Sequence, residues 1–127
     1  MTIATLFAAL TGCAPLTPYA KAVSGFPKDD FLTYRGRRVH AEERGSGRPL
    51  LLLHGFAAST YSFHRLIPRL SDHFRVVALD YNGFGYTERP EDRDDFGIEA
   101  QLDLIRHVMD AKKMGACTVL GQSYGGT

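Results

Sequence analysis

Apolar residues gather in three short runs along this chain, and a loop containing glycine follows each run. The runs cover residues 50–53, 74–79 and 117–120. Short, mainly apolar runs of this kind are typical of strands that are buried on both faces of a parallel sheet. The carboxyl ends of parallel strands lie along one edge of a sheet, where sites form. We therefore expect the three loops to lie at one edge of an α/β domain.

Two segments between these runs have the spacing of amphipathic helices. The first has its apolar positions at Phe63, Leu66, Ile67 and Leu70. Ser59 can cap this helix, and Pro68 predicts a kink or break in it. The second has its apolar positions at Ile98, Leu102, Ile105 and Met109. It is expected to stop near Gly115.

An antiparallel hairpin is predicted ahead of the first run. Residues 31–34 and 39–43 have the composition of strands and flank the basic cluster Arg35–Arg38, which is interpreted as a solvated hairpin tip. Residues 45–47 link the hairpin to the first buried strand, and the charged residues 88–95 predict a solvated loop.

The composition is that of one globular domain without nucleic-acid or metal chemistry. The chain has 127 residues, of which 44% are apolar and 11% aromatic, and its formal net charge is +1. This charge gives no reason to expect a nucleic acid as partner. Neither an HExxH nor a CxxC spacing occurs, so no metal or cofactor is expected.

The N-terminus resembles a bacterial lipoprotein signal peptide. Residues 3–10 are apolar but too few to span a bilayer, and Leu10-Thr11-Gly12-Cys13 resembles a lipobox, although Met1-Thr2 carries no basic residue. We expect a signal peptide over residues 1–12, acylation of Cys13 with anchoring to a membrane of the cell envelope, and a tether over residues 13–30. The alternative is a loose N-terminal arm on a cytoplasmic protein.

The third run leads into the pattern G-x-S-x-G, formed by Gly121, Gln122, Ser123, Tyr124 and Gly125. This pattern after a buried strand is typical of a nucleophile elbow, a sharp strand-to-helix turn that exposes a serine hydroxyl. The turn is crowded, so small residues are needed two positions before and two after the serine, where Gly121 and Gly125 stand.

The other two runs end in loops of related character. His54-Gly55-Phe56 follows the first run, and the glycine lets the backbone come close to a reacting group. Residues 80–87 follow the second run. Asp80, an acid at the end of the second run, is interpreted as a residue that holds this glycine loop. The other histidines are interpreted as surface or helix-flanking residues, namely His40, His64, His73 and His107.

From about residue 31 to residue 127 the sequence resembles the α/β-hydrolase fold. The resemblance rests on three motifs in this order: H-G-x at residues 54–56, D-x-x-G-x-G-x-[ST] at residues 80–87 and G-x-S-x-G at residues 121–125. The resemblance is to the esterase, C–C-bond hydrolase and haloperoxidase-like branch, since the dehalogenase and epoxide-hydrolase branches place aspartate at the elbow. It implies that Ser123 is the nucleophile and that the N–H groups of Phe56 and Tyr124 form the oxyanion hole. His54, Gly55, Gly121 and Gly125 would support these loops.

In this family the acid and the histidine of the triad follow the serine, whereas only residues 124–127 follow it here. The resemblance thus predicts a truncated, N-terminal part of an α/β-hydrolase sheet over residues 31–127: an antiparallel hairpin, then parallel strands with helices on both faces. The strand at 117–120 would be an exposed edge.

The expected function of the complete protein is that of a serine hydrolase acting on a small ester, thioester or activated C–C bond. The alternatives are a catalytically inactive binding protein with this fold and a non-functional gene fragment.

Overall fold

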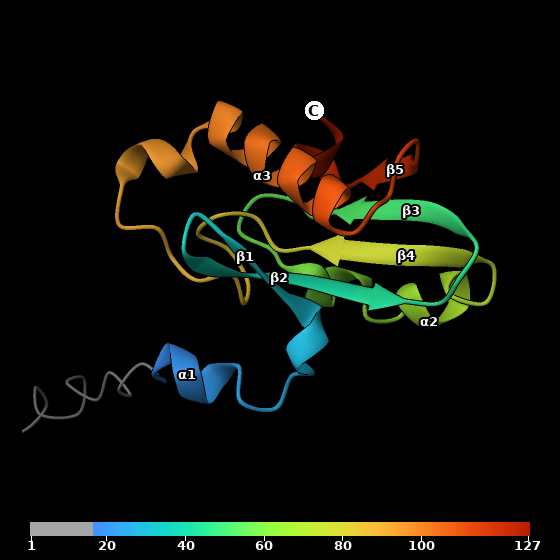
Figure 1. The fold of residues 1–127 in the computed structure, drawn as a ribbon, viewed down its shortest axis with the longest axis horizontal. Coiled ribbons are helices and arrows are strands. Elements are labelled where there is room, and N and C mark those ends of the chain that lie inside the picture. Colours follow the sequence, from blue (N-terminus) through green and yellow to red (C-terminus); the bar gives the residue numbers. More distant parts are fainter. Residues whose placement is uncertain (1–16) are drawn as a thin grey trace, which may run out of the picture.

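A mixed sheet of five strands forms the centre of the fold, in the order β1-β2-β4-β3-β5 (Figure 1). The computed structural model describes residues 17–127, so the predicted signal peptide and Cys13 lie outside the described residues. The strands are β1 (Phe31–Tyr34), β2 (Arg37–Arg44), β3 (Arg48–Leu53), β4 (Phe74–Leu79) and β5 (Thr118–Gly121). β1, β2 and β4 pair antiparallel, whereas β4, β3 and β5 pair parallel. The predicted sheet, a hairpin followed by parallel strands, is confirmed.

The hairpin turn is tighter than predicted. Tyr34 pairs with Arg37, which leaves only Arg35 and Gly36 in the loop, both at positive φ (49° and 77°). A two-residue loop with both φ values positive matches the twist of the flanking strands. Arg37 is therefore not part of a solvated tip. Its guanidinium is mostly buried and pairs with Asp95 at 2.5 Å.

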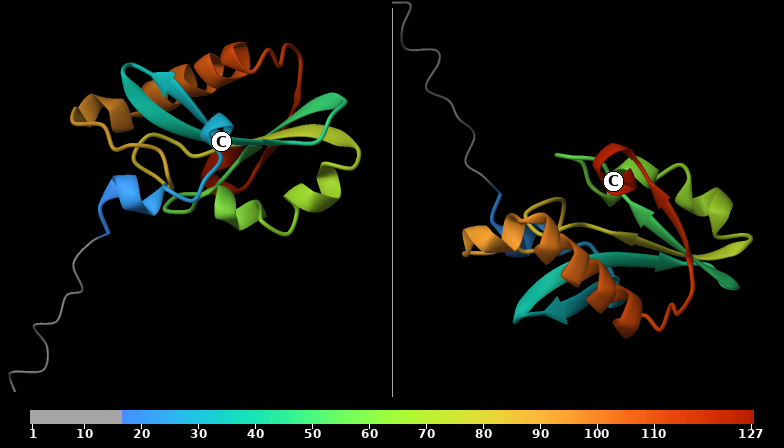
Figure 2. Two further views of the ribbon diagram at one scale, coloured as in Figure 1. Left: turned by 60° about the horizontal axis from the view of Figure 1, so that its bottom comes forward. Right: turned by 90° about the horizontal axis from the view of Figure 1, so that it is seen from above.

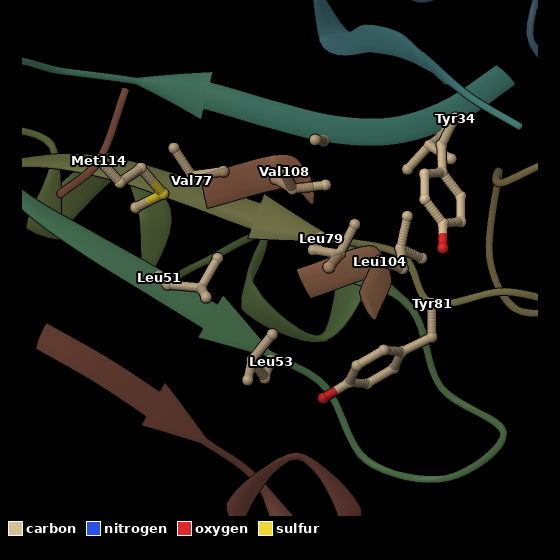
Figure 3. Packing of buried hydrophobic residues seen from close by; sticks show 11 residues of the cluster. Tyr34, Leu51, Leu53, Val77, Leu79, Tyr81, Leu104, Val108 and Met114 are labelled. Atoms are coloured by element: carbon tan, nitrogen blue, oxygen red, sulfur yellow. The ribbon is translucent and has the colours of Figure 1, made fainter. Parts of the chain in front are cut away.

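Helices cover both faces of the sheet, as predicted (Figure 2). The long helix α3 (Ile98–Ala111) lies on one face, and a 3-10 turn (Thr60–Phe63) and the short helix α2 (Ile67–Leu70) lie on the other. Alternate residues of β3 and β4 point to the two faces, so the sheet is buried from both sides. On the α3 face, Figure 3 shows Leu51, Val77 and Leu79 of the strands against Leu104 and Val108 of the helix.

The first predicted helix is interrupted in the structure. Ser59 does cap it, since its hydroxyl accepts a hydrogen bond from the amide of Tyr61 at 3.3 Å, but the segment it caps is only a 3-10 turn. Pro68 stands in the first turn of α2. Proline has no N–H to donate and fits a helix only in its first turn, so a separate helix has to begin there.

The buried face of α3 is rotated from the predicted one. Gln101, Leu104 and Val108 are buried against the sheet, whereas Ile98 and Leu102 are exposed. These two residues line a cavity of about 150 Å³ between α3 and the segment after β5. Part of the predicted apolar stripe, Ile105 and Met109, thus packs against the core on the sheet, whereas Ile98 and Leu102 line the cavity instead.

Part of the predicted tether packs on the domain. Residues 19–30 contain the short helix α1 (Tyr19–Ala22) and a 3-10 turn (Lys28–Asp30), and both Val23 and Asp30 are buried. The Tyr19 hydroxyl donates a hydrogen bond to the carbonyl oxygen of Tyr86 at 3.1 Å. This segment therefore lies beside the loop that follows β4.

Two further 3-10 turns complete the described elements, at Arg93–Phe96 and Ser123–Gly126. The first falls within the loop predicted as solvated, where Asp95 instead binds Arg35 and Arg37. No helix in residues 17–127 has the length and apolar character needed to cross a bilayer.

Candidate active site

The segment after β5 turns sharply at Ser123. Ser123 has φ = 51°, in the left-handed region that side chains other than glycine rarely adopt. The preceding amide, that of Gln122, donates to the carbonyl oxygen of Leu53 at 3.0 Å and ties the turn to the end of β3. A strained serine between a strand and a helical turn is the geometry of a nucleophile elbow.

The two glycines of the motif stand where a side chain would collide with backbone. A β carbon on Gly121 would overlap with the carbonyl group of Gly125, and one on Gly125 would overlap with the carbonyl group of Leu53. Only glycine therefore fits at either position, at Gly121 because the turn folds back on itself and at Gly125 because the turn lies against the end of β3.

The loop after β3 lies against the serine. A β carbon on Gly55 would be 3.4 Å from Cβ and 4.0 Å from Oγ of Ser123, so the side of Gly55 that carries no side chain faces the serine. The loops after β3 and β5, far apart in the sequence, thus meet at the carboxyl edge of the sheet.

His54 is buried and fixes the orientation of this loop. Its Nδ1 donates to the carbonyl oxygen of Gly55 at 2.7 Å, which makes Nε2 the acceptor for the Tyr81 amide at 3.4 Å in a neutral ring. The C=O and N–H of a trans peptide point in opposite directions, so the Phe56 N–H is directed away from the His54 ring. With both ring nitrogens engaged, His54 has no free nitrogen to serve as a base for Ser123.

Phe56 and Tyr124, whose amides are the predicted oxyanion donors, meet through their side chains. Their ring centroids are 6.4 Å apart, and the Phe56 ring, 73% exposed, also meets the ring of Phe84 at 5.6 Å. Tyr124 is the second residue of a helical turn, where an amide has no partner within the turn. Both amides therefore belong to loops that meet at Ser123.

A buried tyrosine packs against the residue that follows Ser123. The Tyr81 ring lies 5.8 Å from that of Tyr124 and 4.8 Å from that of His54. Burial, together with the nearby Tyr124 hydroxyl, raises the pKa of Tyr81 to about 12. Its hydroxyl consequently remains protonated at physiological pH and adds no charge to the site.

Asp80, at the end of β4, holds both the loop after β3 and the loop after β4. Its carboxylate is fully buried and accepts hydrogen bonds from the amides of Thr60 (2.6 Å) and Tyr86 (2.9 Å). Gly85, at φ = 52°, packs so closely on this carboxylate that a β carbon there would overlap with it. These contacts support the interpretation of Asp80 as a residue that holds the glycine loop.

The interpretation of His40 as a surface residue is wrong. His40 is 1% exposed, and its Nδ1 lies 2.9 Å from Oδ2 of Asp80. No local pattern marks this burial, because alternation along β2 places His40 on the face opposite to its buried neighbours Val39 and Ala41. His64 and His73 are exposed, as predicted, and His107 lies within α3, where it is half-buried. Cys117, predicted to be buried in the elbow strand, is half-buried and precedes β5.

A family model, described as the alpha/beta hydrolase fold, matches residues 48–127. The chain belongs to the α/β-hydrolase fold family. Human epoxide hydrolase 4 is 34% identical over 93 residues, which cover 72% of this chain and 26% of that protein. The 2-hydroxy-6-oxo-2,4-heptadienoate hydrolase of Pseudomonas putida is 31% identical over 94 residues, which cover 72% of this chain and 34% of that protein.

A solved α/β-hydrolase fold protein from Burkholderia ambifaria superposes with a TM-score of 0.73 at 29% identity, covering 80% of this chain and 37% of that one. The chain thus spans about a quarter to a third of the length of the curated relatives it matches. Haloalkane dehalogenases are also among these relatives. Hydrolases of several kinds are therefore similar to this chain, and its placement in the esterase, C–C-bond hydrolase and haloperoxidase-like branch stays a prediction.

Proposed function

We propose that this chain carries the nucleophile and the oxyanion hole of a serine hydrolase that transfers acyl groups. The observation that carries the proposal is the strained backbone of Ser123, held against the loop of Gly55 and Phe56. In the proposed reaction Oγ of Ser123 attacks a carbonyl carbon, and the Phe56 and Tyr124 amides donate to the oxyanion that develops.

The chemistry of serine favours an acyl substrate over an epoxide or an alkyl halide. Attack of a serine hydroxyl on a saturated carbon would form an ether, which has no carbonyl for water to attack, so the enzyme would not turn over. Attack on an ester, a thioester or an activated C–C bond beside a carbonyl forms an acyl-enzyme that water can hydrolyse. The substrate class that follows is a small molecule with a reactive carbonyl.

Labelling with a fluorophosphonate probe tests the nucleophile. The protein expressed from its intact gene should be labelled at Ser123, because the probe reacts with an activated serine hydroxyl. The Ser123→Ala variant should not be labelled. A folded wild-type protein that the probe leaves unmodified would instead favour the catalytically inactive binding protein.

Two substitutions at one position test the oxyanion hole. Phe56→Pro deletes the N–H and should lower kcat by about 10²–10³-fold, the usual effect of losing one such donor. Phe56→Ala keeps the N–H and removes only the exposed ring, so it is the matched control. If Phe56→Pro retains the turnover of Phe56→Ala, the assignment of the Phe56 amide is wrong.

We also propose that acylated Cys13 anchors the protein to a membrane of the bacterial cell envelope, with residues 1–12 removed as a signal peptide. The support is the lipobox-like sequence alone. Cells grown with a radiolabelled fatty acid should label the protein, and Cys13→Ser should abolish labelling and move it to the soluble fraction. Labelling that persists in Cys13→Ser would contradict the assignment.

A further inference from the structure

One buried carboxylate connects the two loops that border the candidate oxyanion hole. Asp80 binds the amide of Thr60 through Oδ1 and the amide of Tyr86 through Oδ2. Thr60 ends the loop that carries Phe56, and Tyr86 belongs to the loop that carries Phe84, the aromatic neighbour of Phe56. The direction of the Asp80 carboxylate therefore affects both loops at once.

His40 is the side chain that orients this carboxylate. An ionised carboxylate can only accept hydrogen bonds, so the 2.9 Å contact requires the proton on Nδ1 of His40. His54, whose Nε2 lies 3.7 Å from Oδ1, is not a competing donor, because that nitrogen accepts from Tyr81. The hydroxyl of Thr60 lies at 3.5 Å, the limit of a hydrogen bond.

The His40 ring is held in place by packing on its other sides. The rings of Phe26, Phe31 and Tyr86 surround it, with centroids 5.2, 5.1 and 5.4 Å away. Its Nε2 is buried and has no hydrogen-bond partner among residues 17–127. The contact with Asp80 is thus the principal polar interaction of the ring, and the segment ahead of β1 contributes one wall through Phe26.

We propose that His40 is a positioning residue for the oxyanion loop. It directs the Asp80 carboxylate at the Thr60 and Tyr86 amides, and this contact fixes the loop that presents the Phe56 N–H to Ser123. The proposal rests on the proposed role of the Phe56 amide. It assigns His40, on β2 and distant from the elbow in sequence, an effect on kcat without contact with the substrate.

A pair of variants of similar size separates the hydrogen bond from the packing. His40→Leu removes the donor, whereas His40→Asn keeps an N–H donor at about the place of Nδ1. His107→Leu is the control, since the His107 ring also makes a hydrogen bond, to the backbone oxygen of Thr33 (3.0 Å), and contacts a tyrosine ring but does not touch Asp80.

Hydrogen exchange of the intact protein measures how firmly the Thr60 and Tyr86 amides are held by Asp80, and it does not require turnover. In His40→Leu, the Thr60 and Tyr86 amides should exchange at least about tenfold faster relative to the amides of α3, because their acceptor has lost its orientation. His40→Asn and His107→Leu should leave both amides protected. Unchanged exchange at these amides in His40→Leu, or an equal increase throughout the chain, would overturn the proposal.

Kinetics on a p-nitrophenyl ester give the second measurement. His40→Leu should lower kcat about tenfold or more with little change in KM, and His40→Asn should restore most of the loss. Equal loss in both variants would overturn the proposal. Ser123→Ala tests the proposed function separately: if that variant retains turnover, the serine mechanism fails, whereas an inactive Ser123→Ala beside a fully active His40→Leu refutes the positioning role alone.

Discussion

Gly125 lies directly against the backbone carbonyl of Leu53, where a β carbon would overlap with the oxygen. This contact joins the turn after Ser123 to the last residue of β3. Gly125→Ala should therefore lower the free energy of unfolding by about 1–3 kcal/mol, because backbone has to move to make room. Urea denaturation measures this change. Gly126→Ala is the control, since its β carbon would be 3.5 Å from the nearest atom. Equal stability of the two variants would contradict the close contact.

The strain at Ser123 predicts a gain in stability when its side chain is removed. Ser123→Gly adopts φ = 51° without a steric penalty, whereas Ser123→Ala keeps the β carbon and the strain. We expect the free energy of unfolding of Ser123→Gly to exceed that of Ser123→Ala by ~1 kcal/mol. Both variants lack the hydroxyl, so the difference reports only the backbone. If Ser123→Ala proves as stable as Ser123→Gly, no strain is stored at this position.

The ion pair of Asp30 and Arg44 predicts a loss of stability in acid. Burial by itself raises the pKa of Asp30, but the hydrogen bonds from Arg44 (2.7 and 2.8 Å) and its charge outweigh burial and lower the pKa below its usual 3.8. A lowered folded-state pKa stabilises the fold above the unfolded pKa, and this contribution is lost as the pH falls through the folded value.

The Asp30→Asn variant should therefore be less stable than wild type at neutral pH, and the difference should shrink below about pH 4. Denaturant unfolding across this range measures it. Asp29→Asn, at the exposed neighbouring position, should show no such pH-dependent difference. A constant difference between wild type and Asp30→Asn down to low pH would show that the carboxylate does not interact with Arg44 in solution.

The outer edge of β5 predicts self-association of the 127-residue chain. Val119 is 52% exposed and Leu120 is also exposed, and among residues 17–127 β5 pairs with β3 alone. An apolar strand with a free edge is a template for pairing with another chain. Val119→Lys should raise the concentration at which light scattering detects association. Thr33→Lys, on the exposed face of β1, serves as control, and an equal effect of both substitutions would argue against pairing through β5.

Local patterns made the elbow and the strands predictable. The glycines on either side of Ser123 are required by contacts within the turn and with the end of β3, so a five-residue pattern was enough. The continuous apolar character of residues 50–53 reflects burial from both faces, and the structure confirms it. In both cases the required residue types stand next to one another in the sequence, so a local pattern reveals them although the contacts are with distant segments.

The burial of His40 and the rotation of α3 depend on distant parts of the chain. His40 meets Asp80 because β2 pairs with β4, and no pattern around position 40 specifies that pairing. Ile98 and Leu102 face a cavity beside Tyr124 rather than the sheet, so an apolar stripe alone did not reveal which surface each residue would meet. Both errors concern contacts between segments that the sequence separates widely.

The position of β4 between β2 and β3, two strands that precede it in the chain, affects the order of assembly during synthesis. The hairpin of β1 and β2 emerges from the ribosome first, but it cannot join the rest of the sheet until β4 has emerged as well. Until then the apolar residues of β3 have no parallel neighbour. The nascent chain therefore exposes an aggregation-prone strand from the time β3 leaves the ribosome until β4 has followed it. Chaperone binding to ribosome-bound chains should rise within this interval and fall once β4 is inserted.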